Sequence, residues 1–238
     1  MNSNYSHSHI GKGPLYDSRF HSAPLDEMWN QEKAILKIML NCLRPLRVLD
    51  LACGTGRISS FLAAQAPSAE ITGIDISDSM LQIARKKSTS AVRYIRANMA
   101  EIDLIKTESA FDLITCFRFI TNAENDLRLQ MIECAARHAS KGAILVLNNH
   151  QNIDSIPLRL QNTLKREEHG ISNSAIVKLV ENRDFKLLRT FSLGVTPQDE
   201  RKYLLPTTMS KALERINLKF LAPSHKLGIN QIMIFQVQ

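Results

Sequence analysis

A short apolar strand runs directly into a glycine-rich turn and a helix, and this feature constrains the fold most. Residues Arg47–Leu51 form the apolar run, Gly54 and Gly56 interrupt it, and Ile58–Ala66 has helical spacing. Because glycine has no Cβ, the backbone of the turn can approach a ligand closely, and the helix start presents unpaired N–H groups. The segment predicts a ligand site at the carboxyl end of a strand.

Strands and helices then alternate along the chain. A leading amphipathic helix is expected at Pro24–Leu43, with the proline in its first turn. Further strands are expected at Ile71–Ile74, Val92–Ile95, Phe111–Phe117 and Ala143–Leu147, the last after a turn at Ser140–Gly142. Helices are expected at Ser77–Lys87, with Ser77 as its cap, and at Glu124–His138. The order predicts an α/β fold with a doubly wound, mostly parallel sheet.

The last third of the sequence is less regular. It predicts helices at Leu158–Glu168, Ser172–Asn182 and Met209–Leu221, and strands at Phe185–Leu193 and Gln231–Val237. We expect one domain over residues 46–238, with a small helical insertion at about 151–170. Residues 1–45 would form an N-terminal tail followed by a lid helix.

Composition excludes several classes of protein. No apolar run reaches the length of a membrane span and the start has no secretory pattern, so we expect no integral membrane association and a cytoplasmic location. The four cysteines have neither zinc-site nor disulfide spacing, which predicts free thiols and no metal site. The net charge of +7 is compatible with an acidic partner.

The second predicted strand supplies a carboxylate for the same site. Asp75 lies nineteen residues after Gly56, where a doubly wound sheet would place it beside the turn to accept both hydroxyls of a ribose. A nicotinamide site is not favoured, because Ser59 stands where the third glycine or alanine of G-x-G-x-x-G belongs. The phosphate-binding pattern G-x-x-x-x-G-K-[ST] is absent.

The segment Asp50-Leu51-Ala52-Cys53-Gly54-Thr55-Gly56 resembles the first motif of the class I S-adenosylmethionine (AdoMet) dependent methyltransferases, acid-x-Gly-x-Gly-x-Gly. Ala52 takes the place of the first glycine. The resemblance runs from about Val48 to Leu147. It implies a Rossmann-like sheet of seven strands, with Gln231–Val237 as an antiparallel last strand, and AdoMet as the cofactor.

The resemblance also implies roles for individual residues. Asp50 would hold the turn, mainly through backbone N–H groups, with direct contact to the cofactor as the alternative. The predicted cofactor contacts are Ala52, Gly54 and Gly56 with the methionyl part, Asp75 with the ribose, and Ile76, Asn98 and Met99 with the adenine. Phe117 and Arg118 would lie near the transferred methyl group. Apart from the resemblance, His150 follows the fifth predicted strand and would act as a base where the acceptor must lose a proton; in the alternative it caps a loop.

The acceptor is less constrained. Phe117 and Arg118 stand where amino-methylating DNA enzymes have an Asn/Asp-Pro-Pro-aromatic motif, so a small-molecule or glycosidic acceptor is favoured. An RNA methyltransferase is the alternative, because Lys211, Arg215 and Lys219 form a basic stripe. Such a stripe is more often a solvated face, here opposite Leu213, Ile216 and Phe220, which we expect on the packed side of the helix. A non-catalytic protein with an AdoMet-binding fold is a third possibility.

The aromatic residues that precede the first strand suggest a cover for the cofactor. Tyr16, Phe20 and Trp29 gather in an otherwise polar stretch, and we predict that the arm from Tyr16 to Trp29 closes over the site. In the alternative interpretation, Trp29 packs the leading helix onto the sheet.

Overall fold

A computed structural model describes residues 22–88, 91–104, 110–156, 158, 170–196, 198, 202–220 and 227–238, with the backbone alone at 218–220. The predicted tail before Ser22 and, apart from Leu158, the predicted helix Leu158–Glu168 lie outside the described residues. The helical insertion at 151–170 therefore stays a prediction.

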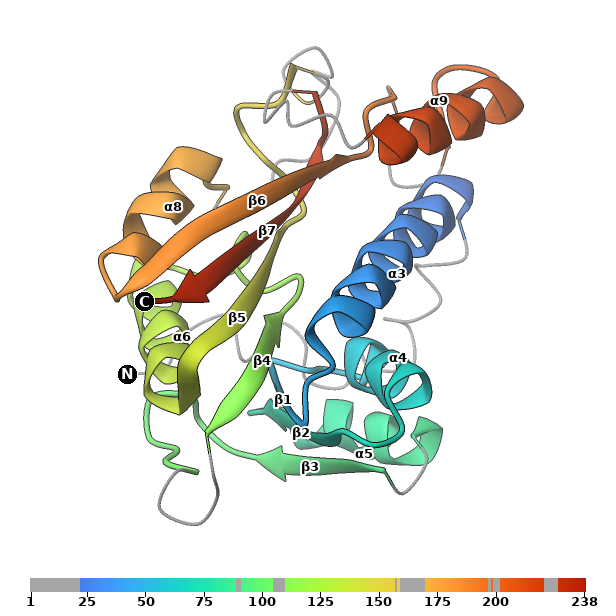
Figure 1. Cartoon of the computed structure of the whole chain (residues 1–238). Coiled ribbons are helices and arrows are strands. Elements are labelled where there is room, and N and C mark those ends of the chain that lie inside the picture. Colours follow the sequence, from blue (N-terminus) through green and yellow to red (C-terminus); the bar gives the residue numbers. More distant parts are fainter. Residues whose placement is uncertain are drawn as a thin grey trace.

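Seven strands form one twisted sheet (Figure 1). Their spatial order is β3 (Val92–Arg96), β2 (Glu70–Asp75), β1 (Arg47–Leu51), β4 (Phe111–Cys116), β5 (Ala139–Asn149), β7 (Asn230–Val237) and β6 (Phe185–Leu193). The first five pair in parallel, and β7 is antiparallel to both β5 and β6. This topology confirms the predicted fold class, including the antiparallel last strand.

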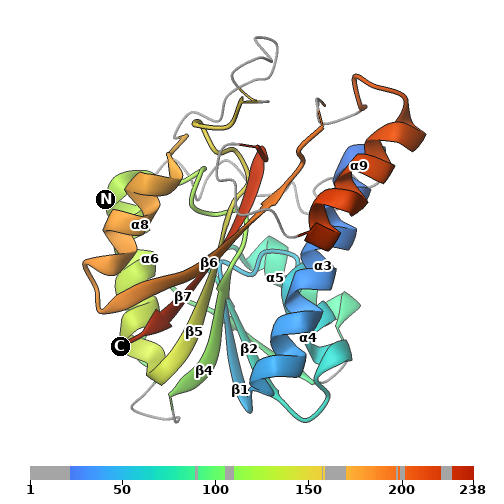
Figure 2. The ribbon, with the colours of Figure 1, turned by 45° about the horizontal axis from the view of Figure 1, so that its top comes forward.

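Helices cover both faces of the sheet, as the turned view shows (Figure 2). One face carries α3 (Ala23–Leu43), α4 (Arg57–Gln65), α5 (Asp78–Lys87) and α9 (Thr207–Phe220). The other face carries α6 (Asn125–His138) and α8 (Asn173–Glu181). The sheet is buried on both sides, which accounts for the near-continuous apolar runs of its central strands.

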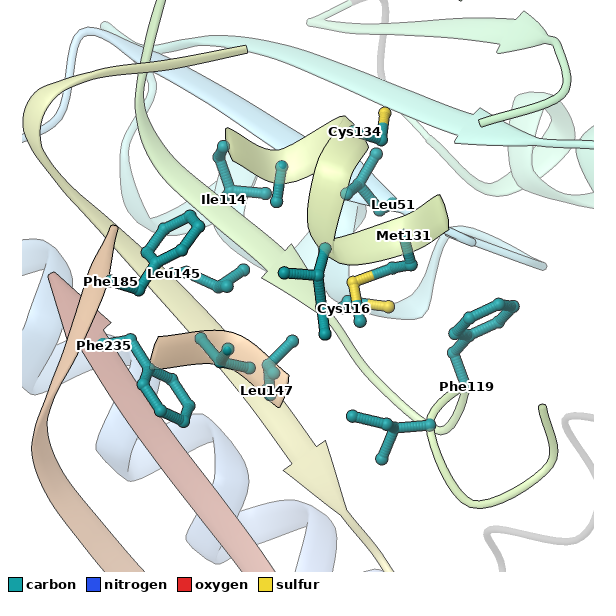
Figure 3. Close-up of a cluster of buried hydrophobic side chains, with 14 of the residues drawn as sticks. Leu51, Ile114, Cys116, Phe119, Met131, Cys134, Leu145, Leu147, Phe185 and Phe235 are labelled. Carbon is teal, nitrogen blue, oxygen red and sulfur yellow. The ribbon is translucent and has the colours of Figure 1, made fainter. Parts of the chain in front are cut away.

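Two hydrophobic clusters hold the layers together. Figure 3 shows the cluster on the α6 side, where Met131 and Cys134 face Leu51, Ile114 and Leu145 from the sheet. The second cluster joins the opposite face to α3 and α4. Each fully buried aliphatic side chain contributes about 1.5 to 3 kcal/mol. The strands whose ends form the site are therefore held in place by packed side chains on both faces of the sheet.

Three local predictions need correction. The fourth strand ends at Cys116, one residue early, because Arg118 turns into the left-handed region at φ +58°. The fifth strand begins at Ala139 rather than Ala143, and the predicted turn becomes an irregularity inside it, with Gly142 at φ +77°. Ser77 stands at the N-cap of α5 but its side chain makes no capping bond.

Candidate cofactor and acceptor site

The turn after β1, which we call the glycine loop (residues 52–56), alternates through left-handed backbone conformations. Ala52, Gly54 and Gly56 have φ angles of +52°, +56° and +73°. The Cys53 amide donates to the Ile74 carbonyl at 2.9 Å, which fastens the loop to β2. Ala52 thus adopts the conformation that suits the glycine it replaces in the motif, at a cost of roughly 1–2 kcal/mol for a residue with a side chain.

The two glycines of the loop face different surroundings. A Cβ added to Gly54 would meet nothing within 4 Å, so the loop is open on that side. A Cβ added to Gly56 would collide with the hydroxyl of Tyr94, which hydrogen bonds to Ser88 at 2.6 Å. Gly56 is therefore required for packing inside the protein, and Gly54 leaves bare backbone exposed toward a ligand.

Asp75, at the end of β2, connects the loop to the next helix. One carboxylate oxygen accepts the Gly54 amide at 2.8 Å, and the other accepts the Ser77 amide at 2.8 Å. The carboxylate is half-buried, so part of it is accessible from outside the protein. The next side chain, Ile76, is 48% exposed beside it. An exposed apolar group next to a carboxylate suits a nucleoside.

Asp50 lies beneath the loop and is 1% exposed. Its carboxylate accepts the hydroxyls of Ser59 at 2.5 Å and Thr115 at 2.8 Å, and also the Ser59 backbone N–H. Burial raises the pKa of Asp50 to about 6, although these hydrogen bonds act in the opposite direction. Asp50 therefore fixes the start of α4 to β4, and its side chain has almost no surface to offer a cofactor.

The residues after β3 make mostly local contacts. The Asn98 side-chain oxygen accepts the Ala100 amide at 3.1 Å, and its nitrogen donates to Glu101 at 3.0 Å. Half-buried Met99 packs partly against the cluster on the α6 side. The side-chain oxygen of Asn98 thus accepts a hydrogen bond within a turn. Its second lone pair is the one that would accept a hydrogen bond from the adenine amine.

The residues after β4 turn toward α3. Phe117 is buried in the cluster on that face of the sheet. The Arg118 amide lies 3.4 Å from the side-chain oxygen of Asn148, and its guanidinium lies 3.5 Å from the carboxylate of Glu32. Arg118 therefore stands at the predicted edge of the sheet with its side chain in an ion pair.

His150 follows β5 and is half-buried. Its Nδ1 lies 2.7 Å from the Thr121 hydroxyl, in the segment after β4. Asn122 in the same segment donates to the Arg118 carbonyl at 2.9 Å. The structure thus brings Arg118 and His150 to the same edge of the sheet, on segments that are joined by hydrogen bonds.

Comparison with known proteins identifies a methyltransferase domain within the chain. Residues 48–143 match a family model described as a methyltransferase domain, and these residues hold the glycine loop, Asp75 and the fourth strand. Over these residues the chain is similar to the AdoMet-dependent methyltransferases. The match ends before His150, so the family model places no constraint on that residue.

The relatives and solved structures that resemble this chain are named for different acceptors. A malonyl-[acyl-carrier protein] O-methyltransferase of Bacillus cereus is 24% identical over 68% of this chain and 62% of its own length. A demethylmenaquinone methyltransferase of Thermotoga maritima is 32% identical over 55% of this chain and 54% of its own. This chain thus spans less than two thirds of either relative.

A solved structure shares the whole fold. The magnesium protoporphyrin IX methyltransferase of Synechocystis, crystallised with S-adenosylhomocysteine (AdoHcy), superposes with a TM-score of 0.68 over 98% of each chain. Its sequence is 15% identical. The methyltransferase fold is therefore retained from α3 to β7, well beyond the matched residues 48–143.

Glu32 on α3 is the main residue of the site that the motif did not indicate. It is 0% exposed, and its carboxylate lies 2.9 Å from Arg57, 3.5 Å from Arg118 and 3.0 Å from the Asn230 amide. Burial alone raises the pKa of Glu32, but the two arginines and these hydrogen bonds bring the pKa below its ordinary value. The carboxylate is therefore held ionised between the glycine loop and the acceptor edge.

Trp29 packs α3 onto α4. The Arg57 guanidinium lies 4.2 Å from the centre of its ring, and the Phe61 ring meets it edge-on at 5.7 Å. These contacts favour the packing interpretation for Trp29. The rest of the predicted arm, Tyr16–Phe20, lies outside the described residues.

Membrane and metal features are absent from the part of the chain that the structure describes. No helix there is long and apolar enough to cross a membrane. The same residues contain no group of three His, Cys, Asp or Glu side chains that would hold a metal ion. The cytoplasmic location stays a prediction.

Proposed function

We propose that this protein transfers a methyl group from AdoMet to oxygen or nitrogen of a small-molecule or glycosidic acceptor. One observation carries the proposal: the left-handed glycine loop is open at Gly54 and is joined there to Asp75, with exposed Ile76 beside it. Bare backbone suits the amino-acid part of AdoMet, a carboxylate suits the ribose hydroxyls, and an apolar side chain suits the adenine.

The residues present fit the cofactor. The loop backbone from Ala52 to Gly56 would hold the methionyl part, Asp75 the ribose hydroxyls, and Ile76 the adenine. When bound, AdoMet supplies a methyl group on a sulfonium, and its in-line displacement needs no nucleophile from the protein. The chain contributes alignment and exclusion of water, worth about 7 to 11 kcal/mol for a well-oriented pair.

His150 is proposed as the base for an acceptor that loses a proton, such as a hydroxyl. Its ring is oriented by the Thr121 hydroxyl and stands at the carboxyl edge of the sheet. Open α/β sheets bind ligands at this edge. An unperturbed imidazole has a pKa near 6.5, which suits proton transfer at neutral pH.

The named acceptors of the similar proteins support a small molecule. A malonyl thioester, a quinone precursor and a porphyrin are all small or carrier-borne compounds. On α9, Arg215 lies 3.6 Å from the carboxylate of Glu27, so one cation of the stripe predicted for RNA makes an internal ion pair. RNA is therefore the weaker alternative.

Transfer of labelled methyl tests the proposal. Purified protein is incubated with methyl-labelled AdoMet and either a metabolite extract or total RNA, and the label is traced. We expect label in low-molecular-weight products, and Asp75→Ala should lose it, because a hydrogen bond to a charged group contributes about 1.5 to 3 kcal/mol to binding. Label in RNA would favour the alternative acceptor, and binding of AdoMet without transfer would indicate a non-catalytic protein.

A further inference from the structure

We propose that Glu32 is an electrostatic positioning residue that sets the preference of this site for cationic AdoMet over neutral AdoHcy. The inference rests on the proposed function and deepens it. Its basis is that one buried carboxylate pairs with two arginines, each next to a different half of the site.

The two arginines flank the region in which the methyl group would be transferred. Arg57 directly follows Gly56 and begins α4, so its position is tied to the glycine loop. Arg118 lies two residues beyond the end of β4, at the acceptor edge. Both side chains are 14% exposed, so water screens them little.

Glu32 is itself held in place by a chain of amides. The Asn230 side chain donates to Glu32 at 3.0 Å and accepts from Asn148 at 2.6 Å. The Asn148 oxygen in turn lies 3.4 Å from the Arg118 amide. These hydrogen bonds fix the position of the carboxylate, and so of its negative charge, relative to β5, β7 and the residue Arg118 that follows β4.

The two forms of the cofactor respond differently to this charge. The sulfonium of AdoMet is positive, whereas the thioether of AdoHcy is neutral, and the two molecules are otherwise nearly the same shape. A fixed negative charge beside two guanidinium groups lowers the positive potential felt by the sulfonium and leaves the thioether almost unaffected. Glu32 therefore favours substrate binding and product release together.

Binding calorimetry on charge variants provides the test. Glu32→Gln should weaken AdoMet relative to AdoHcy by about five- to fifteen-fold, roughly the effect of removing one charge from a partly screened medium. Arg118→Gln should shift the ratio of the two affinities in the opposite direction. The double variant should return the ratio to within about two-fold of wild type, because it restores the net charge.

Glu27→Gln is the matched control. Glu27 lies on the same helix, is 4% exposed, and pairs with Arg215 of α9 rather than with Arg57 or Arg118. Its replacement deletes the same charge from the same helix and leaves the ion pairs of Arg57 and Arg118 with Glu32 in place. We expect the ratio of the AdoMet and AdoHcy affinities to stay within about two-fold of wild type.

Each outcome either supports or overturns the proposal. If Glu32→Gln lowered the affinities for AdoMet and AdoHcy equally, Glu32 would have only a packing role and the proposal would be overturned. Should that variant fail to fold, Arg118→Gln alone decides, since an unchanged ratio there also overturns the proposal. A wild-type protein that binds neither ligand would instead refute the proposed function, which separates the two failures.

Discussion

Ala52 places a methyl group on a backbone that suits glycine. Its φ of +52° lies in the left-handed region, yet the loop keeps the same conformation at Gly54 and Gly56. Ala52→Gly should therefore raise the free energy of unfolding by about 0.5 to 1 kcal/mol, after allowance for the more flexible unfolded chain. In thermal denaturation we expect a Tm increase of about 1 to 4 °C. Gly56→Ala, which collides with Tyr94, should lower the Tm; a decrease for Ala52→Gly as well would show that the Ala52 methyl packs favourably.

Asp50 makes stability depend on pH. Its folded-state pKa of about 6 is above the ordinary value of 3.8, so between these values the folded protein holds a proton that the unfolded chain has lost. The contribution of Asp50 to the free energy of unfolding therefore falls as pH rises through this window and is lowest above pH 6. Relative to Asp50→Asn, the wild type should lose roughly 1 to 2 kcal/mol between pH 5 and pH 7 in urea unfolding. A difference that is constant with pH would contradict the raised pKa.

His150 offers a test of general-base catalysis. If the acceptor loses a proton to this imidazole, His150→Gln should lower kcat by about 10²- to 10⁴-fold while AdoMet affinity stays close to wild type, because the residue is not in the glycine loop. Thr121→Val, which removes only the hydroxyl that orients the ring, should give a smaller loss. Steady-state kinetics and calorimetry measure the two quantities, and an unchanged kcat in His150→Gln would assign the residue to packing.

Asp75 could be found from the sequence and Glu32 could not, for a physical reason. Asp75 ends the strand that follows the glycine loop in the same strand–helix–strand unit, so its place beside the loop can be predicted from a short stretch of sequence. Glu32 lies on the apolar stripe of α3, in line with Met28 and Ile35. That position indicates that the acid is buried, but it does not indicate which residues it pairs with. Its partners, Arg57 and Arg118, are separated from it by long stretches of chain, so only the folded structure identifies them.

At the scale of elements, α9 reverses the expected burial. We predicted that Leu213 and Ile216 would lie on the packed side, but they are 42% and 52% exposed. The helix instead buries Ser210 and Glu214. The periodicity of the sequence was read correctly as helical, but the buried face was assigned by hydrophobicity alone. The end of β6 presents backbone amides rather than an apolar surface, and a carboxylate satisfies them.

Variants on the two faces of α9 should behave oppositely. The Glu214 carboxylate accepts the amides of Gly194 and Thr196 at 3.1 and 2.8 Å and the Thr196 hydroxyl at 2.7 Å. Glu214→Gln replaces one acceptor by a donor, so we expect a loss of about 1 to 3 kcal/mol in chemical denaturation. Leu213→Gln on the exposed face should change stability by less than about 0.5 kcal/mol. A larger loss for Leu213→Gln than for Glu214→Gln would mean that the apolar face is the packed one.

Two predicted strands agree with the structure at both ends. The strands from Arg47 and Phe185 match their predicted bounds. β1 is buried from Val48 onward, whereas β6 lies at the edge of the sheet and mixes buried and exposed positions in its first half.

The predicted start of β5 was wrong: Ala139 already pairs with Phe111, and the polar residues Ser140–Gly142, expected to form a turn, lie in the register shift before Ile144 pairs with Leu113. The antiparallel direction of β7 followed from the family resemblance. Its place between β5 and β6 comes from the structure, because periodicity alone does not determine which strands are neighbours.

At the scale of the whole molecule, ligand binding should stabilise the fold. The glycine loop joins β1, β2 and α4, so a ligand bound there favours the folded state over the unfolded one. At about one hundred times the dissociation constant, AdoMet should add about 2.7 kcal/mol, which corresponds to a Tm increase of about 5 to 10 °C for a chain of this length. Thermal-shift measurements check this, with NAD as the control ligand. An equal shift with NAD would contradict the methyltransferase pattern of the loop.

The sheet order has a consequence for synthesis on the ribosome. β7 separates β5 from β6, so both earlier strands leave the exit tunnel before the strand that joins them. Asn230 of β7 also completes the partners of Glu32, although the glycine loop is translated much earlier. A nascent chain that stops before Asn230 should therefore keep an open edge on β5 and an unfinished ligand site, and limited proteolysis of stalled chains should cut it more readily than the released protein.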